Sequence, residues 1–295
     1  MGRGMSEKMR KTAVMTDSNS GLTVKEAKAL GVYMLPMPIY LDDVMYYENE
    51  TLTREEFFAR QANGAVIHTS QPVLGELLDR WNAILKEFDD LVYIPMSSGL
   101  SGSCAAAMAI SEKYEGRVVV VNNQRISVPL AQAVKDARKL VQEGKNALEI
   151  REYLMKTRFD SSIYITVDTL EYLKKGGRIT PAAAAVGTVL NLKPVLTIQG
   201  EQLDAFAKVR GMKAAKKRMI TALEDDMNRR FSSIPRGELR LEAAYTCSDE
   251  EAFQWKQMLE EHFGQACDMS PLPLSIACHT GPGALGCAFT RQYIG

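Results

Sequence analysis

Residues 91–107 read LVYIPMSSGLSGSCAAA: an apolar run, then a loop of serine and glycine, then the start of an alanine-rich segment. The apolar run 91–95 predicts a short buried strand, and alanine is the residue that most favours a helix. A strand that passes through a short loop into a helix is the repeating unit of a sheet covered by helices. This stretch therefore predicts an α/β fold.

Apolar runs alternate with amphipathic segments throughout the first half of the chain. In the segment 130–143, Leu130, Val134, Ala137 and Val141 recur at helical spacing, with charged residues between them. Such alternation of strands and helices over about 150 residues predicts a mostly parallel sheet flanked by helices. The expected strands are 12–15, 32–40, 65–68, 91–95 and 118–121, and the expected helices are 23–30, 53–63, 73–88, 103–114 and 130–143.

The pattern changes beyond residue 163, where longer and irregular segments separate the apolar runs. Strands are expected at 162–167, 193–198, 239–246 and 274–279, with a small-residue helix from Pro181 to Gly187 and a charged helix over 211–231. The sequence therefore predicts two α/β domains. Residues 12–163 would form the domain with the parallel sheet, and residues 164–295 a smaller domain with a mixed sheet.

Composition excludes several classes of protein. The chain has 295 residues, with 36 Lys and Arg against 36 Asp and Glu. This balance argues against a surface that binds nucleic acid or an anionic membrane along its whole length. Apolar runs stay shorter than the roughly 18 residues of a membrane span, so no integral membrane segment is expected. The five cysteines form no C-x-x-C pair, which argues against a zinc site or disulfide framework and favours the reducing cytoplasm.

Three polar clusters follow apolar runs in the first half, at 16–20, 68–72 and 97–103. If all three followed strands of one parallel sheet, they would meet at the edge where ligands of such folds bind. The serine and glycine loop 97–103 is also suited to an anion, because free N–H groups and the helix dipole attract negative charge. An ordinary serine cap and turn explains the same loop, and both interpretations stay open.

The same loop offers two serine nucleophiles, Ser98 and Ser101. The hydrolase pattern G-x-S-x-G is incomplete around Ser101, because Ser103 occupies its last position. A serine-dependent hydrolase or acyltransferase acting on a small acid or ester remains the alternative function. The chain contains no P-loop, kinase motif or metal-ligand cluster, so we expect no catalytic residue, metal or cofactor.

Basic residues gather in two places in the second half. Arg178 ends a basic and glycine-rich turn at 174–178, ahead of the helix expected at Pro181. A longer basic run extends from Lys208 through Arg210 to Arg218 without any acidic residue. A solvated helix face explains this run, and an acidic partner or a phosphate explains it equally well.

Six segments, in order and spacing, resemble the DegV family of bacterial fatty-acid-binding proteins. The resemblance covers nearly the whole chain, from about Thr12 to Phe289. The matching segments are 16–18 (TDS), 68–72 (HTSQP), 97–103 (SSGLSGS), 172–179 (YLKKGGRI), 192–196 (LKPVL) and 279–283 (HTGPG).

The resemblance implies a two-domain α/β fold with a long-chain fatty acid held between the domains. It also implies that the ligand's carboxylate is bound by the hydroxyls of Thr69 and Ser98, with Ser70 and Ser97 adjacent. Family members in some bacteria are the lipid-carrying subunit of a fatty acid kinase. They present the acid to a separate ATP-dependent subunit that makes the acyl phosphate, so the carrier itself is not an enzyme.

Further positions follow from the same resemblance. It places Arg178 and His279 near the head group, and Arg210, with its neighbour Lys208, near the contact with the kinase subunit. The chain departs from the family pattern at 122–129, where NNQRISVP replaces an Asp-Ser pair and a small, glycine-containing stretch. This departure changes the loop beside the expected site.

Overall fold

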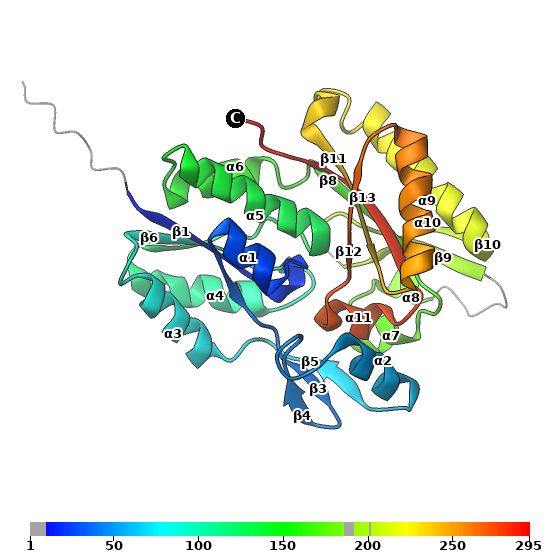
Figure 1. The fold of residues 1–295 in the computed structure, drawn as a ribbon, viewed down its shortest axis with the longest axis horizontal. Coiled ribbons are helices and arrows are strands. Elements are labelled where there is room, and N and C mark those ends of the chain that lie inside the picture. The colour runs from blue at the N-terminus through cyan, green and yellow to red at the C-terminus, as the bar shows by residue number, and fades with distance from the viewer. Residues whose placement is uncertain (1–9, 186–191, 201) are drawn as a thin grey trace, which may run out of the picture.

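The computed structural model describes residues 10–185, 192–200 and 202–295, and its first sheet is parallel (Figure 1). The strand order in this sheet is β2-β1-β6-β7. Because β1 lies inside the sheet and both faces are covered, all six of its residues are buried. The strands are β1 (Thr12–Asp17), β2 (Val32–Leu35), β6 (Asp90–Ile94) and β7 (Val118–Val120).

Helices cover both faces of this sheet. Ala13, Met15 and Tyr93 point to one face and pack against α3 and α4. Val14 and Val92, on alternate positions, point to the other face and pack against α1, α5 and α6. The helices are α1 (Val24–Leu30), α3 (Leu74–Ile84), α4 (Ser103–Ser111), α5 (Ser127–Gln142) and α6 (Ala147–Lys156).

The second sheet has six strands in the order β10-β9-β8-β13-β11-β12. All of its pairs are antiparallel except β11 with β12, so the sheet is mixed as predicted. Helices α9 (Gly211–Asn228) and α10 (Asp249–Phe263) cover one face. The strands are β8 (Ser161–Thr166), β9 (Leu192–Ile198), β10 (Asp204–Arg210), β11 (Leu239–Tyr245), β12 (Cys267–Pro271) and β13 (Leu285–Arg291).

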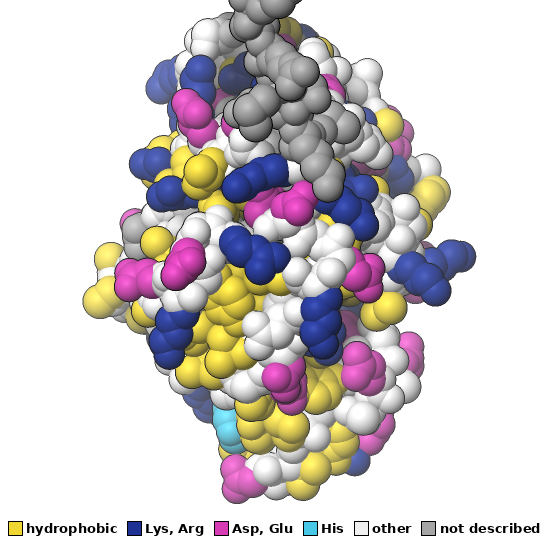
Figure 2. Space-filling model, turned by 90° about the vertical axis from the view of Figure 1, so that its left-hand side faces the viewer, with side chains coloured by type: hydrophobic (Ala, Val, Ile, Leu, Met, Phe, Trp, Pro, Cys, Tyr) yellow, Lys and Arg dark blue, Asp and Glu magenta, His cyan; other side chains and the backbone are white. Residues whose placement is uncertain are grey.

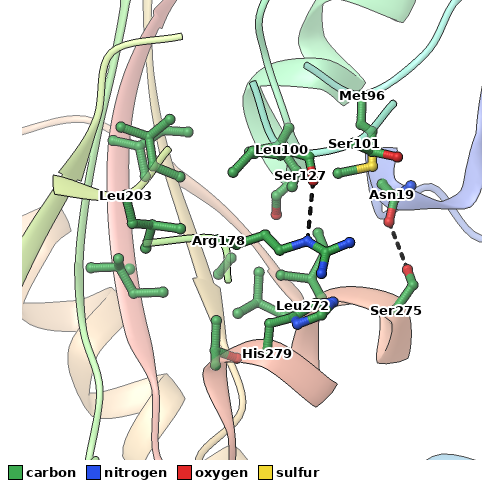
Figure 3. A pocket seen from close by; sticks show the side chains of 18 of the residues that line it. Asn19, Met96, Leu100, Ser101, Ser127, Arg178, Leu203, Leu272, Ser275 and His279 are labelled. Atoms are coloured by element: carbon green, nitrogen blue, oxygen red, sulfur yellow. Dashed lines mark hydrogen bonds between the residues drawn. The ribbon is translucent and has the colours of Figure 1, made fainter. Parts of the chain in front are cut away.

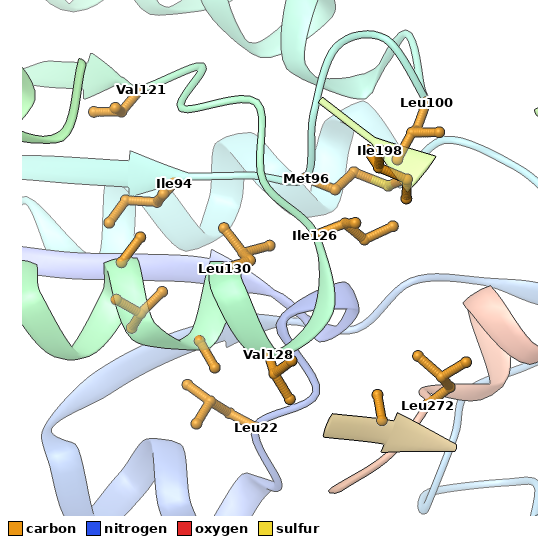
Figure 4. Packing of buried hydrophobic residues seen from close by; sticks show 14 of the residues in the cluster. Leu22, Ile94, Met96, Leu100, Val121, Ile126, Val128, Leu130, Ile198 and Leu272 are labelled. Carbon is orange, nitrogen blue, oxygen red and sulfur yellow. The ribbon is translucent and has the colours of Figure 1, made fainter. Parts of the chain in front are cut away.

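One apolar core joins the two sheets. Helix α5 contacts β1 of the first sheet and β11 and β13 of the second. Figure 4 shows side chains from both parts of this core, among them Ile94 of β6, Leu130 of α5 and Ile198 of β9. The α/β fold class with a parallel and a mixed sheet is confirmed, and a continuous buried cluster packs the two sheets against each other.

The prediction of a strand at 274–279 is wrong, because these residues form helix α11 (Leu274–Thr280). Leu274, Ala277 and Cys278 share one helical face and pack against α2 (Arg54–Ala62) and the small sheet described next. A short apolar run has the same sequence pattern in a buried strand as in a short buried helix. The residues that pack against it determine which of the two forms.

The single strand predicted at 32–40 is also wrong, because β2 ends at Leu35 and a new strand starts at Ile39. Pro36 and Pro38 lie between them, and proline cannot donate to a strand ladder. The new strand, β3 (Ile39–Leu41), belongs to a three-stranded antiparallel sheet of order β4-β3-β5. The other two strands of this sheet are β4 (Val44–Tyr46) and β5 (Ile67–Thr69). The cluster 68–72 therefore follows this small sheet and not the parallel one.

Several elements carried too little signal to be expected from the sequence, including α6, α10, β10, β12 and β13. The strand β8 begins at Ser161 and crosses the expected domain boundary at residue 163. The helix expected from Pro181 begins there as α8 (Pro181–Ala184), while its residues 186 and 187 lie outside the described part. The remaining short helices are η1 (Ser18–Ser20), η2 (Glu112–Tyr114), α7 (Glu171–Gly176) and η3 (Arg236–Glu238).

The surface agrees with the balanced composition. On the face shown in Figure 2, Lys and Arg side chains are interspersed with Asp and Glu around hydrophobic patches. Within the described residues, no helix is both long enough and apolar enough to cross a membrane.

Candidate functional site

A cavity lies where the carboxyl edge of the parallel sheet faces the six-stranded sheet. Its walls come from η1, the loop after β6 and the start of α5 on one side, and from β8, β9, β11 and β13 on the other. The cavity has a volume of about 150 Å³. Because residues from many elements line this small volume, the cavity is narrow. The sheet edge predicted to bind a ligand therefore does form one wall of a cavity.

The wall on the second sheet is apolar. It consists of Ile163 and Ile165 of β8, Ile198 of β9, Ala244 of β11, and Gly286 and Ala288 of β13. The small residues on β11 and β13 leave room above the sheet, and the isoleucines on β8 and β9 line its side. Leu203, Leu272 and Leu173 extend this apolar lining.

Polar side chains gather at the other end, and Thr69 and His279 are paired there. Thr69 ends β5, His279 lies in the last turn of α11, and the hydroxyl Oγ1 is 3.0 Å from the ring Nε2. Burial, and to a smaller extent the Arg178 charge, lower the pKa of His279 to about 4. The imidazole is therefore neutral near pH 7, with one N–H donor and one acceptor nitrogen. Ser70 lines the same cavity.

Arg178 brings the positive charge of the cavity. Gly177 caps α7 in the left-handed conformation, with φ 69°, and turns the following Arg178 toward the loop after β6. Its Nε donates to the Leu100 carbonyl at 3.3 Å (Figure 3), and its Nη1 donates to the Gly176 carbonyl. A guanidinium has five N–H donors, so these two bonds leave donors for an anion in the cavity.

The loop after β6 places its serines differently from the expectation. Ser97 is buried and donates to the Gly200 carbonyl at 2.6 Å, which ties the loop to the second sheet. Ser98 is exposed, and its hydroxyl accepts from Asn122 Nδ2 at 2.7 Å. Neither is among the residues that line the cavity, whereas Ser101 is. The structure therefore brings Thr69, Ser70, Arg178 and His279 together, and the loop serine beside them is Ser101.

The two candidate nucleophiles lack a base. Ser101 Oγ accepts from the Ser103 N–H at 3.2 Å, and within the described residues neither Ser98 nor Ser101 hydrogen-bonds to a histidine or a carboxylate. No group of three His, Cys, Asp or Glu side chains in the described part could hold a metal ion.

Asp17, Asn19 and Ser275 form a network that the sequence did not reveal. Asp17 accepts from the N–H and side-chain amide of Asn19, both at 3.0 Å, and from the Met96 N–H at 2.9 Å. Asn19 in turn accepts from the Ser275 hydroxyl at 2.7 Å (Figure 3). Burial raises the pKa of Asp17 to about 6. This network connects the parallel sheet to α11, and therefore helps to position His279.

Lys208 and Arg210 lie away from the cavity. Both are exposed on β10, the edge strand of the second sheet. Farther along the basic run, Lys216 lies 3.9 Å from Glu251 and Arg218 stacks over Phe206 at 4.3 Å. The run is thus partly engaged within the fold, and its first residues point to solvent.

Comparisons with known proteins show the family of this chain. A family model described as "Uncharacterised protein, DegV family" matches residues 11–292. The chain belongs to the DegV family. A DegV domain-containing protein from Deinococcus radiodurans is 30% identical over 277 residues, which cover 94% of this chain and 97% of that protein.

Solved structures of DegV proteins share the fold. One, titled as fatty acid binding of a DegV family protein from Thermus thermophilus, has a TM-score of 0.85 at 30% identity and covers 95% of this chain and 99% of its own. Another, described as DegV, a fatty acid binding protein from Bacillus subtilis, has a TM-score of 0.83 at 25% identity. It covers 96% of this chain and 100% of its own.

The loop that departs from the DegV pattern forms part of the cavity. Ile126 to Pro129 line it, while Arg125 is buried and points elsewhere, donating to the Thr157 carbonyl at 2.6 Å. The Ser97 N–H donates to the Arg125 carbonyl at 2.9 Å, so the substituted loop also supports the loop after β6.

Proposed function

We propose that this protein binds a long-chain fatty acid in the cavity between its two sheets. The observation that carries the proposal is the division of one narrow cavity into two ends. One end presents Thr69, Arg178 and His279, and the wall on the second sheet is lined by aliphatic side chains. An amphiphile with one acidic head and a long apolar tail matches this division.

The head group needs hydrogen bonds, because a carboxylate that leaves water without partners is strongly destabilised. The Ser70 hydroxyl already donates to the Gln71 carbonyl at 2.9 Å. The cavity therefore offers the Arg178 guanidinium, the Ser101 hydroxyl, and the one donor that the Thr69–His279 pair does not use in its own hydrogen bond. A charged hydrogen bond from Arg178 is the strongest of these. We therefore assign the carboxylate to this end. Ser97 and Ser98 would act indirectly, through the loop that carries Ser101.

The tail would supply most of the affinity. A tail of about fourteen methylenes, at roughly 0.8 kcal/mol each, contributes about 11 kcal/mol before the costs of association. Ile163, Ile165 and Ile198 lie where such a chain would leave water. Affinity would then depend on tail length, and orientation on the head group.

We further propose that the protein presents its fatty acid to a separate ATP-dependent kinase subunit, and that it is a carrier in the cytoplasm. The absence of a base at Ser98 and Ser101 in the described residues supports a carrier over a serine hydrolase. Its five cysteines are unpaired, which suits a reducing compartment. Lys208 and Arg210 are exposed and suited to an acidic partner.

Ligand extraction tests the binding proposal. Native mass spectrometry of the purified protein is expected to show the mass of one long-chain acid, identified after extraction. The double variant Thr69→Val with Arg178→Gln should purify without it, while Thr51→Val, at an exposed threonine outside the cavity, should retain it. A wild-type protein that stays empty when incubated with hexadecanoate would contradict the proposal.

The kinase proposal has a separate test. Loaded protein mixed with a bacterial fatty acid kinase catalytic subunit and ATP should form acyl phosphate. Arg210→Glu should slow this reaction without changing hexadecanoate affinity, and Arg236→Glu, at another exposed arginine, should not slow it. If acyl phosphate forms at the same rate in both variants, Arg210 does not take part in the contact with the kinase subunit.

A further inference from the structure

The N-terminus of α5 opens into the cavity. The four residues at this point, Ile126 to Pro129, all line it. They are apolar except for Ser127, which Figure 3 shows near Leu100 and Arg178 and on the opposite side of Arg178 from His279. The helix start therefore faces the ligand space from the loop that departs from the family pattern.

No side chain in the described ranges caps this helix start. The N-cap residue is Ile126, and the first turn carries no acidic residue. The first N–H groups of any helix have no partner within the helix, and they are normally bonded to a capping side chain or to water. Here the residues around them are buried, so an acceptor would have to come from the contents of the cavity.

Ser127 adds an independent observation. The residue is 7% exposed, and its hydroxyl has no hydrogen-bond partner among the described residues. Within the same described part, Asn123 Nδ2 and Arg125 Nη1 of this loop also have no hydrogen-bond partner, but those residues do not line the cavity. Ser127 also adopts φ 56°, a conformation that favours glycine, yet it carries a side chain. A buried hydroxyl without a partner is unfavourable, and a ligand oxygen would relieve this.

We propose that Ser127 and the N-terminus of α5 form a second polar subsite, which binds a hydroxyl group carried on the acyl chain. This inference rests on the proposed fatty-acid site. Arg178, which lies near Ser127, is assigned to the carboxylate head group, and the neighbours of Ser127 at the helix start, Ile126, Val128 and Pro129, carry no charge. A neutral hydroxyl therefore fits this position better than a second carboxylate. Because Ser127 lies near Arg178, the ligand's hydroxyl group would be on a carbon close to the carboxylate, namely the second or third carbon. The protein would then prefer 2- or 3-hydroxy fatty acids.

Competition binding tests the preference with hexadecanoate, 2-hydroxyhexadecanoate and 3-hydroxyhexadecanoate. One of the hydroxy acids should bind the wild-type protein about tenfold more tightly than hexadecanoate, which corresponds to one satisfied buried hydrogen bond. In Ser127→Ala and Ser127→Gly the ratio of the two affinities should fall to near one. The glycine variant suits the positive φ, and its thermal unfolding shows whether the fold is retained.

Ser103→Ala is the matched control. Ser103 is also the first residue of a helix, is 4% exposed and has an unpartnered hydroxyl, but it does not line the cavity. This variant should keep the tenfold ratio. Equal wild-type affinities for all three acids, or a ratio that survives in folded Ser127 variants, would overturn the subsite. Failure of all three acids to bind would instead overturn the fatty-acid proposal.

Discussion

Gly286 offers a direct way to fill the cavity from its apolar wall. This residue lies on β13 between Ile165 of β8 and Ala244 of β11, and all three line the cavity. A Cβ at this position would lie 3.5 Å from the Tyr164 carbonyl oxygen, 3.6 Å from that of Ala244 and 3.8 Å from Ile165 Cβ. These are ordinary van der Waals distances, so the backbone can accept a side chain.

Gly286→Val would therefore place three carbon atoms where the acyl chain is proposed to lie. Displacing about three methylenes at roughly 0.8 kcal/mol each costs about 2.4 kcal/mol of binding free energy. Hexadecanoate should then bind about 50-fold more weakly. The fold should be retained or slightly stabilised, because valine favours strands and glycine costs more backbone entropy on folding.

The assay is displacement of a fluorescent fatty acid, combined with thermal unfolding of the ligand-free protein. Gly237→Val is the matched control, because Gly237 lies outside the cavity and a Cβ at this position would meet no atom within 4 Å. It should change neither the affinity nor the unfolding temperature appreciably. If Gly286→Val unfolds normally yet binds hexadecanoate as tightly as the wild type, the tail does not pass β13 and the reasoning is refuted.

Three further predictions concern charged groups. Arg178→Gln should weaken hexadecanoate binding about 20-fold by removing a charged hydrogen bond, and should change hexadecanol binding much less; equal losses for acid and alcohol would indicate a structural role. A carboxylate bound beside His279 should raise its pKa from about 4, so at pH 5 the wild-type protein should take up more protons on binding than His279→Gln, in which only the ligand's own carboxyl exchanges a proton. Calorimetry in buffers of different ionisation enthalpy measures this uptake, which should be smaller in His279→Gln; equal uptake in both proteins would contradict the contact. Burial raises the pKa of Glu242 from 4.5 to about 7, so the folded protein loses stability as the pH rises through this interval. Glu242→Gln should therefore be more stable than wild type by about 3 kcal/mol at pH 8, with little difference below pH 4.5, and a pH-independent gap in denaturant unfolding would be inconsistent with this cause.

The local pattern of residues was sufficient for much of the fold. The run 91–95 forms β6, and the spacing of Leu130, Val134 and Ala137 belongs to the buried face of α5. These signals are readable because alternate burial in strands and helical burial in helices are properties of neighbouring residues. The order of six short motifs was likewise enough to indicate the family, which the comparisons confirm.

The site depended on contacts that no local pattern contains. Thr69 and His279 are 210 positions apart in the chain, and α11 was expected to be a strand. Ser97, Ser98 and Ser101 look alike in the sequence, yet only the last lines the cavity.

The sequence by itself thus determined many of the elements, the fold class and the family of this protein. Tertiary structure decided which polar side chains share a cavity, and it left the Ser127 hydroxyl without a hydrogen-bond partner in the part of the chain that the structure describes. The physical reason is that propensity and periodicity are local, whereas the direction of a side chain and its desolvation depend on what packs against it.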